Sequence, residues 1–246
     1  MKLNLSTKSY IGLVLILAIL SSISIFLPQG QIVGQYELPA SKPIMALASF
    51  SIILVLYGGL GFIGLKLSKK LGFAEIWNKN ISSKKRFVMP ALIGIGLGIF
   101  FILADLIFSK FHAFGALPHP PFPISLIASA TAGIGEEIIF RLFFISFWVW
   151  LISYVILKKK CQNQIFWIVS VFSAFAFAFG HLPSIMALFN LTSISQVPLA
   201  LMIEIILLNG ALSLFAASCF RKYGFLAAVG IHFWTDIIWH VIYGIL

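Results

Sequence analysis

The sequence has few charged side chains and almost no cysteine. Only 10% of its 246 residues are Asp, Glu, Lys or Arg, whereas soluble globular domains carry roughly 25%. Its two cysteines are too few for a disulfide framework and do not have the spacing of a metal site. This scarcity argues against an ordinary soluble domain and against a small secreted domain held by disulfides.

Apolar residues fill most of the chain. They make up 61% of it, and the mean hydropathy is +1.06. A helical membrane span needs about 20 such residues. The sequence therefore predicts an all-α polytopic membrane protein, a single integral membrane domain over residues 1–246 with no soluble domain. The expected spans are Tyr10–Leu27, Ile44–Leu67, Val88–Ser109, Phe122–Leu157, Ile165–His181, Val197–Phe220 and Phe225–Leu246. There are seven spans, or eight if the long fourth segment divides in two.

The basic residues are distributed unequally between the two ends of these spans. If the N-terminus is cytoplasmic, 14 of the 17 lysines and arginines fall on the cytoplasmic side, against Lys42 and Lys110 outside and Arg141 within the membrane. Cytoplasmic loops of membrane proteins carry such an excess. We therefore expect a cytoplasmic N-terminus. Because the charges are divided among short loops, we expect no nucleic-acid partner.

Acidic residues are rare, yet most of them interrupt apolar segments. Five of the seven do so: Asp105, Glu136, Glu137, Glu204 and Asp236. Charge inside a membrane is costly unless it is paired or faces a polar cavity. Glu137 and Arg141 stand four residues apart, so they share a helix face and can form an ion pair, whereas Glu136 is rotated by about 100°. We therefore expect a polar cavity with one carboxylate held and the other free.

Histidines lie in two of the later segments. His181 closes the fifth, and His232 stands four residues before Asp236 in the seventh. A carboxylate one turn away can orient an imidazole, or the two groups can share a water or a metal. His240 continues this stripe and is interpreted as a bystander. His112 and His119 are predicted to be solvated in a Pro-rich outer loop, and the roles of Asp105 and Glu204 stay open.

Three motifs in order carry a resemblance to a known family. They are Glu136-Glu137-x-x-x-Arg141, Phe177-x-x-x-His181 and His232-x-x-x-Asp236. Over residues 123–246 the chain resembles the CPBP family, also called Abi or CAAX prenyl protease type II. The third motif of the family usually ends in Asn, where this chain has Asp236.

The resemblance implies an intramembrane endopeptidase. Glu136 would activate a water molecule, while His181, His232 and Asp236 would position that water or stabilise the oxyanion. Glu137 and Arg141 would hold the helix geometry around Glu136. Family members have been described both as glutamate proteases and as metalloproteases. If a divalent metal such as zinc is bound, its ligands would be Glu136, His181, His232 and Asp236. We favour the metal-free glutamate type because the sequence lacks His-Glu-x-x-His.

The resemblance leaves the substrate open among a prenylated C-terminus, a pheromone or bacteriocin precursor, and a segment of a membrane protein. The compact chain favours a prokaryotic plasma membrane. One alternative is a non-enzymatic binding or immunity protein, in which replacing Glu136 would leave function intact. Another is a proton-coupled transporter, although no inverted repeat is visible in the sequence.

Three local patterns give further expectations. Straight spans would keep His181 and His232 apart, so the uncharged stretch Pro183–Gln196 is expected to dip into the interior, with Leu182–Pro183 ending a helix inside the membrane. The glycines at 94, 96 and 98 are expected to allow close helix packing. The basic connection Leu71–Phe87 is expected to lie along the cytoplasmic surface.

Overall fold

The computed structural model describes residues 4–28, 30 and 39–246, and this part of the chain contains helices and no strand. The helices are α1 Leu5–Ser24, α2 Lys42–Ile52, α3 Gly58–Lys70, α4 Met89–Phe108, α5 Ile124–Glu137, α6 Ser146–Val149, α7 Gln162–Gly180, α8 Leu182–Leu188, α9 Leu199–Tyr223 and α10 Phe225–Asp236. π-helical stretches join or extend several of them: Ile53–Tyr57, Lys84–Val88, Ile138–Ile145, Trp150–Ile156 and Ile237–Ile242. The prediction of an all-α fold is confirmed.

Seven helical stretches among the described residues are long and apolar enough to cross a membrane. They are Leu5–Ser24, Lys42–Lys70, Lys84–Phe108, Ile124–Ile156, Gln162–Leu188, Leu199–Tyr223 and Phe225–Ile245. The fourth is one continuous helical stretch of 33 residues rather than two spans. The count of seven is confirmed, and the eight-span alternative is not adopted by the chain.

The fifth span departs from its predicted course. Helix α7 ends at Gly180, a single turn residue follows, and α8 continues the span to Leu188. Pro183 lies in the first turn of α8, where a missing N–H leaves no helical hydrogen bond unmade. A helix thus ends directly before Leu182–Pro183, close to the predicted place, but the chain continues as α8. Residues 183–196 are half-buried or exposed rather than interior, so the predicted dip is wrong.

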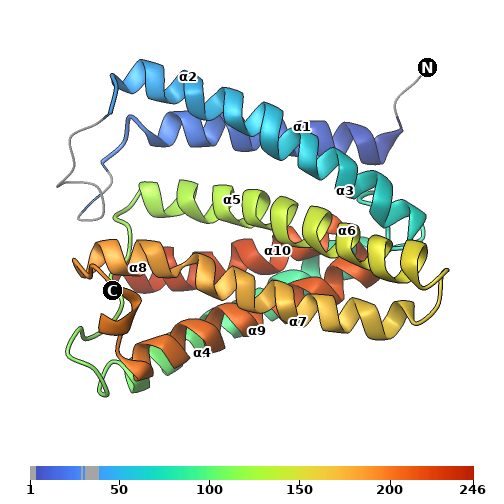
Figure 1. Cartoon of the computed structure of the whole chain (residues 1–246). Coiled ribbons are helices and arrows are strands. Elements are labelled where there is room, and N and C mark those ends of the chain that lie inside the picture. Colours follow the sequence, from blue (N-terminus) through green and yellow to red (C-terminus); the bar gives the residue numbers. More distant parts are fainter. Residues whose placement is uncertain (1–3, 29, 31–38) are drawn as a thin grey trace.

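Helix α10 occupies the centre of the bundle, where it packs against α4, α5 and α9 (Figure 1). Helix α1 packs against α2 and α5 and forms with α2 and α3 an outer layer of the molecule (Figure 1). Two glycines allow the close approach of α4 to α10. A Cβ at Gly94 would lie 2.5 Å from the Ile231 carbonyl oxygen, and one at Gly98 would lie 2.5 Å from Ile238 Cβ, whereas Gly96 has nothing within 4 Å. The packing interpretation is confirmed for Gly94 and Gly98.

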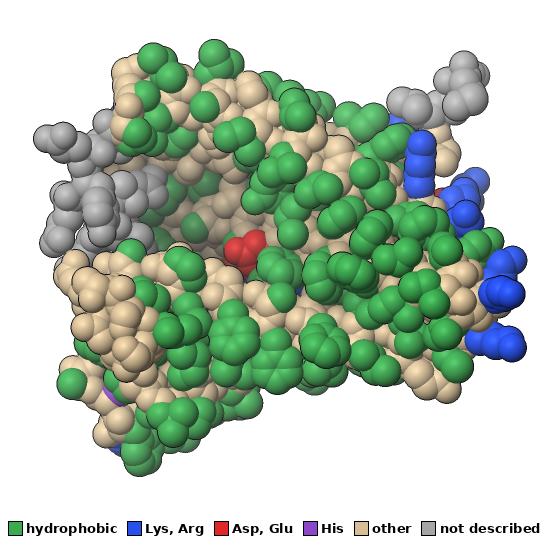
Figure 2. Space-filling model, viewed as in Figure 1, with side chains coloured by type: hydrophobic (Ala, Val, Ile, Leu, Met, Phe, Trp, Pro, Cys, Tyr) green, Lys and Arg blue, Asp and Glu red, His purple; other side chains and the backbone are tan. Residues whose placement is uncertain are grey.

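The two ends of the bundle differ in charge. Lysine and arginine side chains gather at the end where α1 begins, and the C-terminus lies at the other end (Figures 1 and 2). The Leu71–Phe87 connection lies at the basic end but only part of it is superficial. Leu71, Phe73 and Ile76 are buried, while Arg86 stacks 4.4 Å from the Trp77 ring. This connection is anchored in the protein rather than resting wholly on a membrane surface.

Candidate active site

Helices α5 and α10 pack closely where the first and third motifs lie. A Cβ at Gly133 would lie 3.2 Å from the backbone nitrogen of Phe233, so a larger residue would push the two helices apart. Glu137 stands one turn beyond Gly133 on the same face of α5, and His232 precedes Phe233 on α10. This contact brings the Glu137 carboxylate to the imidazole of His232.

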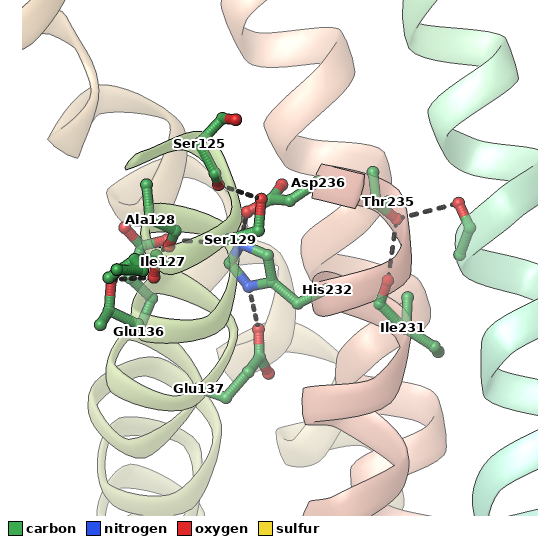
Figure 3. Close-up of polar contacts among 12 residues, drawn as sticks. Ser125, Ile127, Ala128, Ser129, Glu136, Glu137, Ile231, His232, Thr235 and Asp236 are labelled. Atoms are coloured by element: carbon green, nitrogen blue, oxygen red, sulfur yellow. Dashed lines mark hydrogen bonds and ion pairs between the residues drawn. The ribbon is translucent and has the colours of Figure 1, made fainter. Parts of the chain in front are cut away.

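Glu137 is held on both of its carboxylate oxygens, and Figure 3 shows its contact with His232. The Oε1 atom lies 2.9 Å from His232 Nδ1, and the Oε2 atom lies 3.1 Å from Arg141 Nε. Glu137 and Arg141 are fully buried, and the Arg141 guanidinium also lies 4.6 Å from the Phe177 ring centre. The predicted ion pair within the first motif is confirmed. A π-helical stretch begins directly after Glu137, a feature often found at functional sites.

The other ring nitrogen of His232 faces two further carboxylates. His232 Nε2 lies 3.6 Å from Glu136 Oε2 and 3.5 Å from Asp236 Oδ2. These distances are too long for direct hydrogen bonds, but the groups are close enough to interact through charge. Glu136 keeps 37% of its side chain exposed, against none for Glu137. One carboxylate is thus fixed and its neighbour is free.

His181 belongs to the same site through the break between α7 and α8. Its Nδ1 donates to the Phe177 carbonyl at 2.8 Å, which leaves Nε2 for other partners. The Phe177 ring centre lies 4.9 Å from the His181 ring and 5.8 Å from the His232 ring. The two histidines line one cavity, although residues 183–196 do not make the predicted dip.

Two hollows meet at Glu136. The first is a cavity of about 210 Å³, lined by Glu136, His181, His232 and Asp236 among others. The second is a groove of about 710 Å³ between α1, α2 and α5. Glu136 and Ala132 line both. Figure 2 shows an acidic side chain at the base of a hollow between the helices.

The four residues named as ligands of a possible metal line one cavity. Within the described residues, no group of three or more His, Cys, Asp and Glu side chains is placed to hold a metal ion. Both histidines direct Nδ1 to protein oxygens, His232 to Glu137 and His181 to Phe177. Zinc requires several donors converging on one point at about 2 Å. The two Nδ1 bonds leave each Nε2 open, as in metal-ligating histidines, so the donor set is compatible with both protease types.

Residues 118–238 match a family model described as type II CAAX prenyl endopeptidase Rce1-like. This match covers all three motifs, and it agrees with the family that they resemble. No curated protein and no solved structure matches the chain. The family match and the seven apolar helices together indicate an integral membrane protein of a protease family whose substrates are peptides.

A contact between two histidines near the site was not expected from the sequence. His119 Nδ1 lies 3.2 Å from His240 Nδ1, and its ring packs 4.6 Å from the Trp239 ring. Burial lowers the pKa of His119 to about 4. The prediction that His119 is solvated is therefore wrong. His240 lines the cavity and is no bystander in position, and its place one turn after Asp236 was the signal for this.

A second cluster of buried polar side chains connects the loop 109–123 to α4 and α9. The Asp105 Oδ1 atom accepts from the Leu117 backbone N–H at 3.0 Å, and Glu204 Oε2 lies 3.5 Å from His112 Nε2. His112 and Glu204 have no exposed side-chain surface. The prediction of a solvated His112 is wrong, because its partner comes from α9, 92 residues further along the chain.

Proposed function

We propose that this chain is an intramembrane endopeptidase in which Glu136 activates water for attack on a peptide bond. The position of Glu136 supports this role. Among the carboxylates around His232 it is the most exposed, and it lies where the groove and the cavity meet. A substrate and a water molecule can both reach it there, whereas the fully buried Glu137 is engaged by His232 and Arg141.

In the proposed reaction Glu136 takes a proton from the water as its oxygen bonds to the carbonyl carbon. The carbonyl oxygen becomes an oxyanion. Because Nδ1–H of each histidine is bonded to Phe177 or Glu137, the oxyanion is stabilised by Nε2–H of His181 and His232 in their doubly protonated form. Glu136 then gives its proton to the amide nitrogen, the C–N bond breaks, and a carboxylic acid and an amine are released, with the proton of the acid passing to the amine. No oxidant, metal or second substrate enters this balance.

Glu137 and Arg141 act as positioning residues in this proposal. Glu137 accepts from His232 Nδ1 and thereby fixes the orientation of the ring, so that Nε2 points to Glu136 and Asp236. Carboxylates that hold an imidazole in one orientation are common second partners of functional histidines. Arg141 balances the charge of Glu137 in a place where an unpaired carboxylate would be costly.

Asp236 is proposed to position the water together with His232. It stands where the resembling family usually has Asn, and its carboxylate lies beside His232. An aspartate accepts hydrogen bonds as an asparagine oxygen does but adds a negative charge. The polar coordination is therefore preserved with a changed local field.

The proposed substrate is a peptide segment that lies within or against the bilayer. The groove between α1, α2 and α5 is lined mainly by apolar side chains with a few hydroxyls, among them Ser21, Ser49 and Thr131. Such a surface suits an apolar chain whose backbone polar groups still need partners. The proposed location is a prokaryotic plasma membrane with the N-terminus in the cytoplasm.

The test is cleavage of a membrane-embedded peptide library by the purified full chain, with Glu136→Gln beside the wild type. Loss of a general base typically slows a reaction by about 10²–10⁴-fold, so we expect cleavage to fall by that factor. Glu75→Gln is the matched control, because Glu75 pairs with Lys69 on the surface. Its cleavage rate should stay at the wild-type level.

A chelator separates the two protease types in the same assay. Cleavage that persists with chelator and disappears in Glu136→Gln supports the glutamate mechanism. Cleavage that the chelator removes contradicts the metal-free reaction. Cleavage that survives Glu136→Gln contradicts the role of Glu136, and no cleavage by any variant favours a binding protein.

A further inference from the structure

Glu136 does not lie midway along its span. It stands 12 residues after the first residue of Ile124–Ile156 and 20 residues before the last. At ~1.5 Å per residue, it is about 18 Å from one end of the helical stretch and about 30 Å from the other. The nearer end follows the loop 109–123, and the farther end leads to the lysines 158–160 at the basic end.

The long path from Glu136 to the basic end is filled with packed side chains. Ile138, Leu142, Ile145 and Val149 follow Glu136 along the span, and none of them exposes more than 1% of its surface. They belong to one core with residues of α1, α7, α9 and α10, among them Tyr10, Phe166, Phe220 and Phe225. A peptide or a hydrated ion has no route through this core. A separate groove of about 250 Å³ in this half, lined by Thr7, Val14 and Phe62 among others, does not include Glu136.

Both hollows lie in the opposite half of the molecule. The cavity is lined by Leu117 and Pro118 from the loop after α4, and by Leu188 at the end of α8. The groove is lined by Ile25, just after α1, and by Met45 near the start of α2. Each of these residues lies at the end of its helix that is farther from the basic loops.

The charge distribution assigns the two ends to the two faces of the membrane. The basic end carries 14 lysines and arginines in sequence, whereas the other end carries Lys42 and Lys110. An excess of this kind marks the cytoplasmic face. The packed core therefore faces the cytoplasm, and the two hollows at Glu136 face the other side.

We propose that the catalytic site is reached from the non-cytoplasmic face, and that the substrate is a peptide that has entered or crossed the membrane. Its scissile bond would be presented about 18 Å below the outer ends of the helices. A tail anchored to the cytoplasmic surface would face the packed core instead. This proposal rests on the proposed peptidase function for its substrate, but the direction of access stands on packing and charge alone.

The test uses cysteine accessibility, which needs no cleavage. Native Cys161 is exposed in the loop that leads to α7 at the basic end, while Cys219 is buried. In a Cys161→Ser, Cys219→Ala background, Ala132→Cys reports on the hollows and Ala116→Cys on the outer loop. The wild-type Cys161 marks the basic end. Intact cells are treated with a charged, membrane-impermeant methanethiosulfonate, before and after permeabilisation.

We expect Ala132→Cys and Ala116→Cys to react in intact cells, and Cys161 to react only after permeabilisation. Reaction of Ala132→Cys only after permeabilisation, or not at all, would overturn the proposal. So would reaction of Cys161 in intact cells. Thr131→Cys, which lines the groove, is the second reporter if Ala132→Cys does not fold.

Adding Glu136→Gln to the Ala132→Cys variant separates this proposal from the enzymatic one. The labelling pattern should be the same with and without that change. A protein that fails to cleave but labels from outside would contradict the peptidase function alone. A protein that cleaves but labels only from the cytoplasmic side would contradict the direction of access alone.

Discussion

The half of the bundle near the basic loops is built around a packed apolar core, whereas the half beyond Glu136 holds the two hollows that Glu136 lines. Within the described residues, the packed half buries a continuous apolar cluster that includes Ile138, Leu142 and Phe166. The hollow half holds the cavity, the groove and buried polar groups such as Asp105 and Glu204. The same class of apolar helices thus builds two different interiors.

The boundary between the two halves falls between adjacent residues. Glu137 points into packed surroundings and is fully buried, while Glu136 reaches the hollows. A rotation of about 100° per helical residue separates the fixed carboxylate from the free one. In the packed half, Glu137 fixes the orientation of His232. In the other half, the hollows leave room for a substrate beside Glu136. A preorganised site requires both a fixed side chain and an open space next to it.

The largest expected effect comes from breaking the ion pair at this boundary. Arg141→Met leaves Glu137 buried without its cationic partner, and the loss of one member of a buried pair typically costs about 3–5 kcal/mol. We expect the free energy of unfolding, measured by denaturant titration in detergent micelles, to fall by that amount.

Lys69→Met is the matched control for the arginine change. It breaks the pair with Glu75, whose distance is also 3.1 Å but whose side chains are 62% and 36% exposed. Exposed pairs contribute about 0–1 kcal/mol. Equal losses in the two variants would show that burial does not distinguish these pairs, and the contrast between the halves would weaken.

A smaller effect is expected from glycine changes on α3 in the packed half. A Cβ at Gly64 would run into the backbone of Leu142 and Phe143, which cannot move as a side chain can. Overpacking of this kind costs about 1–3 kcal/mol. Gly59 lies on the same helix with nothing within 4 Å.

We therefore expect Gly64→Ala to lower the midpoint of thermal unfolding in detergent and Gly59→Ala to leave it unchanged or slightly higher. Equal stability of the two variants would mean that α3 and the fourth span do not approach as closely as described. In that event the packed half would be looser than its contacts indicate.

Sequence patterns predicted the spans and the local pairs of this protein well. The number of spans followed from apolar length, and the Glu137–Arg141 pair followed from four-residue spacing on one helix. The family resemblance followed from three motifs in order. These features depend on residues close in sequence or on composition, which a single chain displays directly.

Contacts between distant segments were not predictable in the same way. The bonds of Glu137 to His232, and of Glu204 to His112, join residues more than 90 positions apart. The helix end near Leu182–Pro183 was predicted, but the new helix α8 was not, although a proline is tolerated in the first turn of a helix. The division into packed and hollow halves has no sequence signal, because both halves are built from equally apolar segments.

The smallest effect on stability, and the sharpest test of the comparison, is expected from filling the hollow. Ala132 lines both the groove and the cavity, so Ala132→Leu has open space for its extra atoms and should change the free energy of unfolding by less than about 0.5 kcal/mol. The same atoms would obstruct the path to Glu136, and cleavage should fall about tenfold or more, equivalent to about 1.4 kcal/mol in the barrier. Ala176→Leu, at an exposed position of α7, should change neither quantity.

If Ala132→Leu instead destabilised the protein by the 1–3 kcal/mol typical of overpacking, its surroundings would be packed like those of Gly64. The molecule would then have one kind of interior rather than two, and Glu136 would have no open route to a substrate.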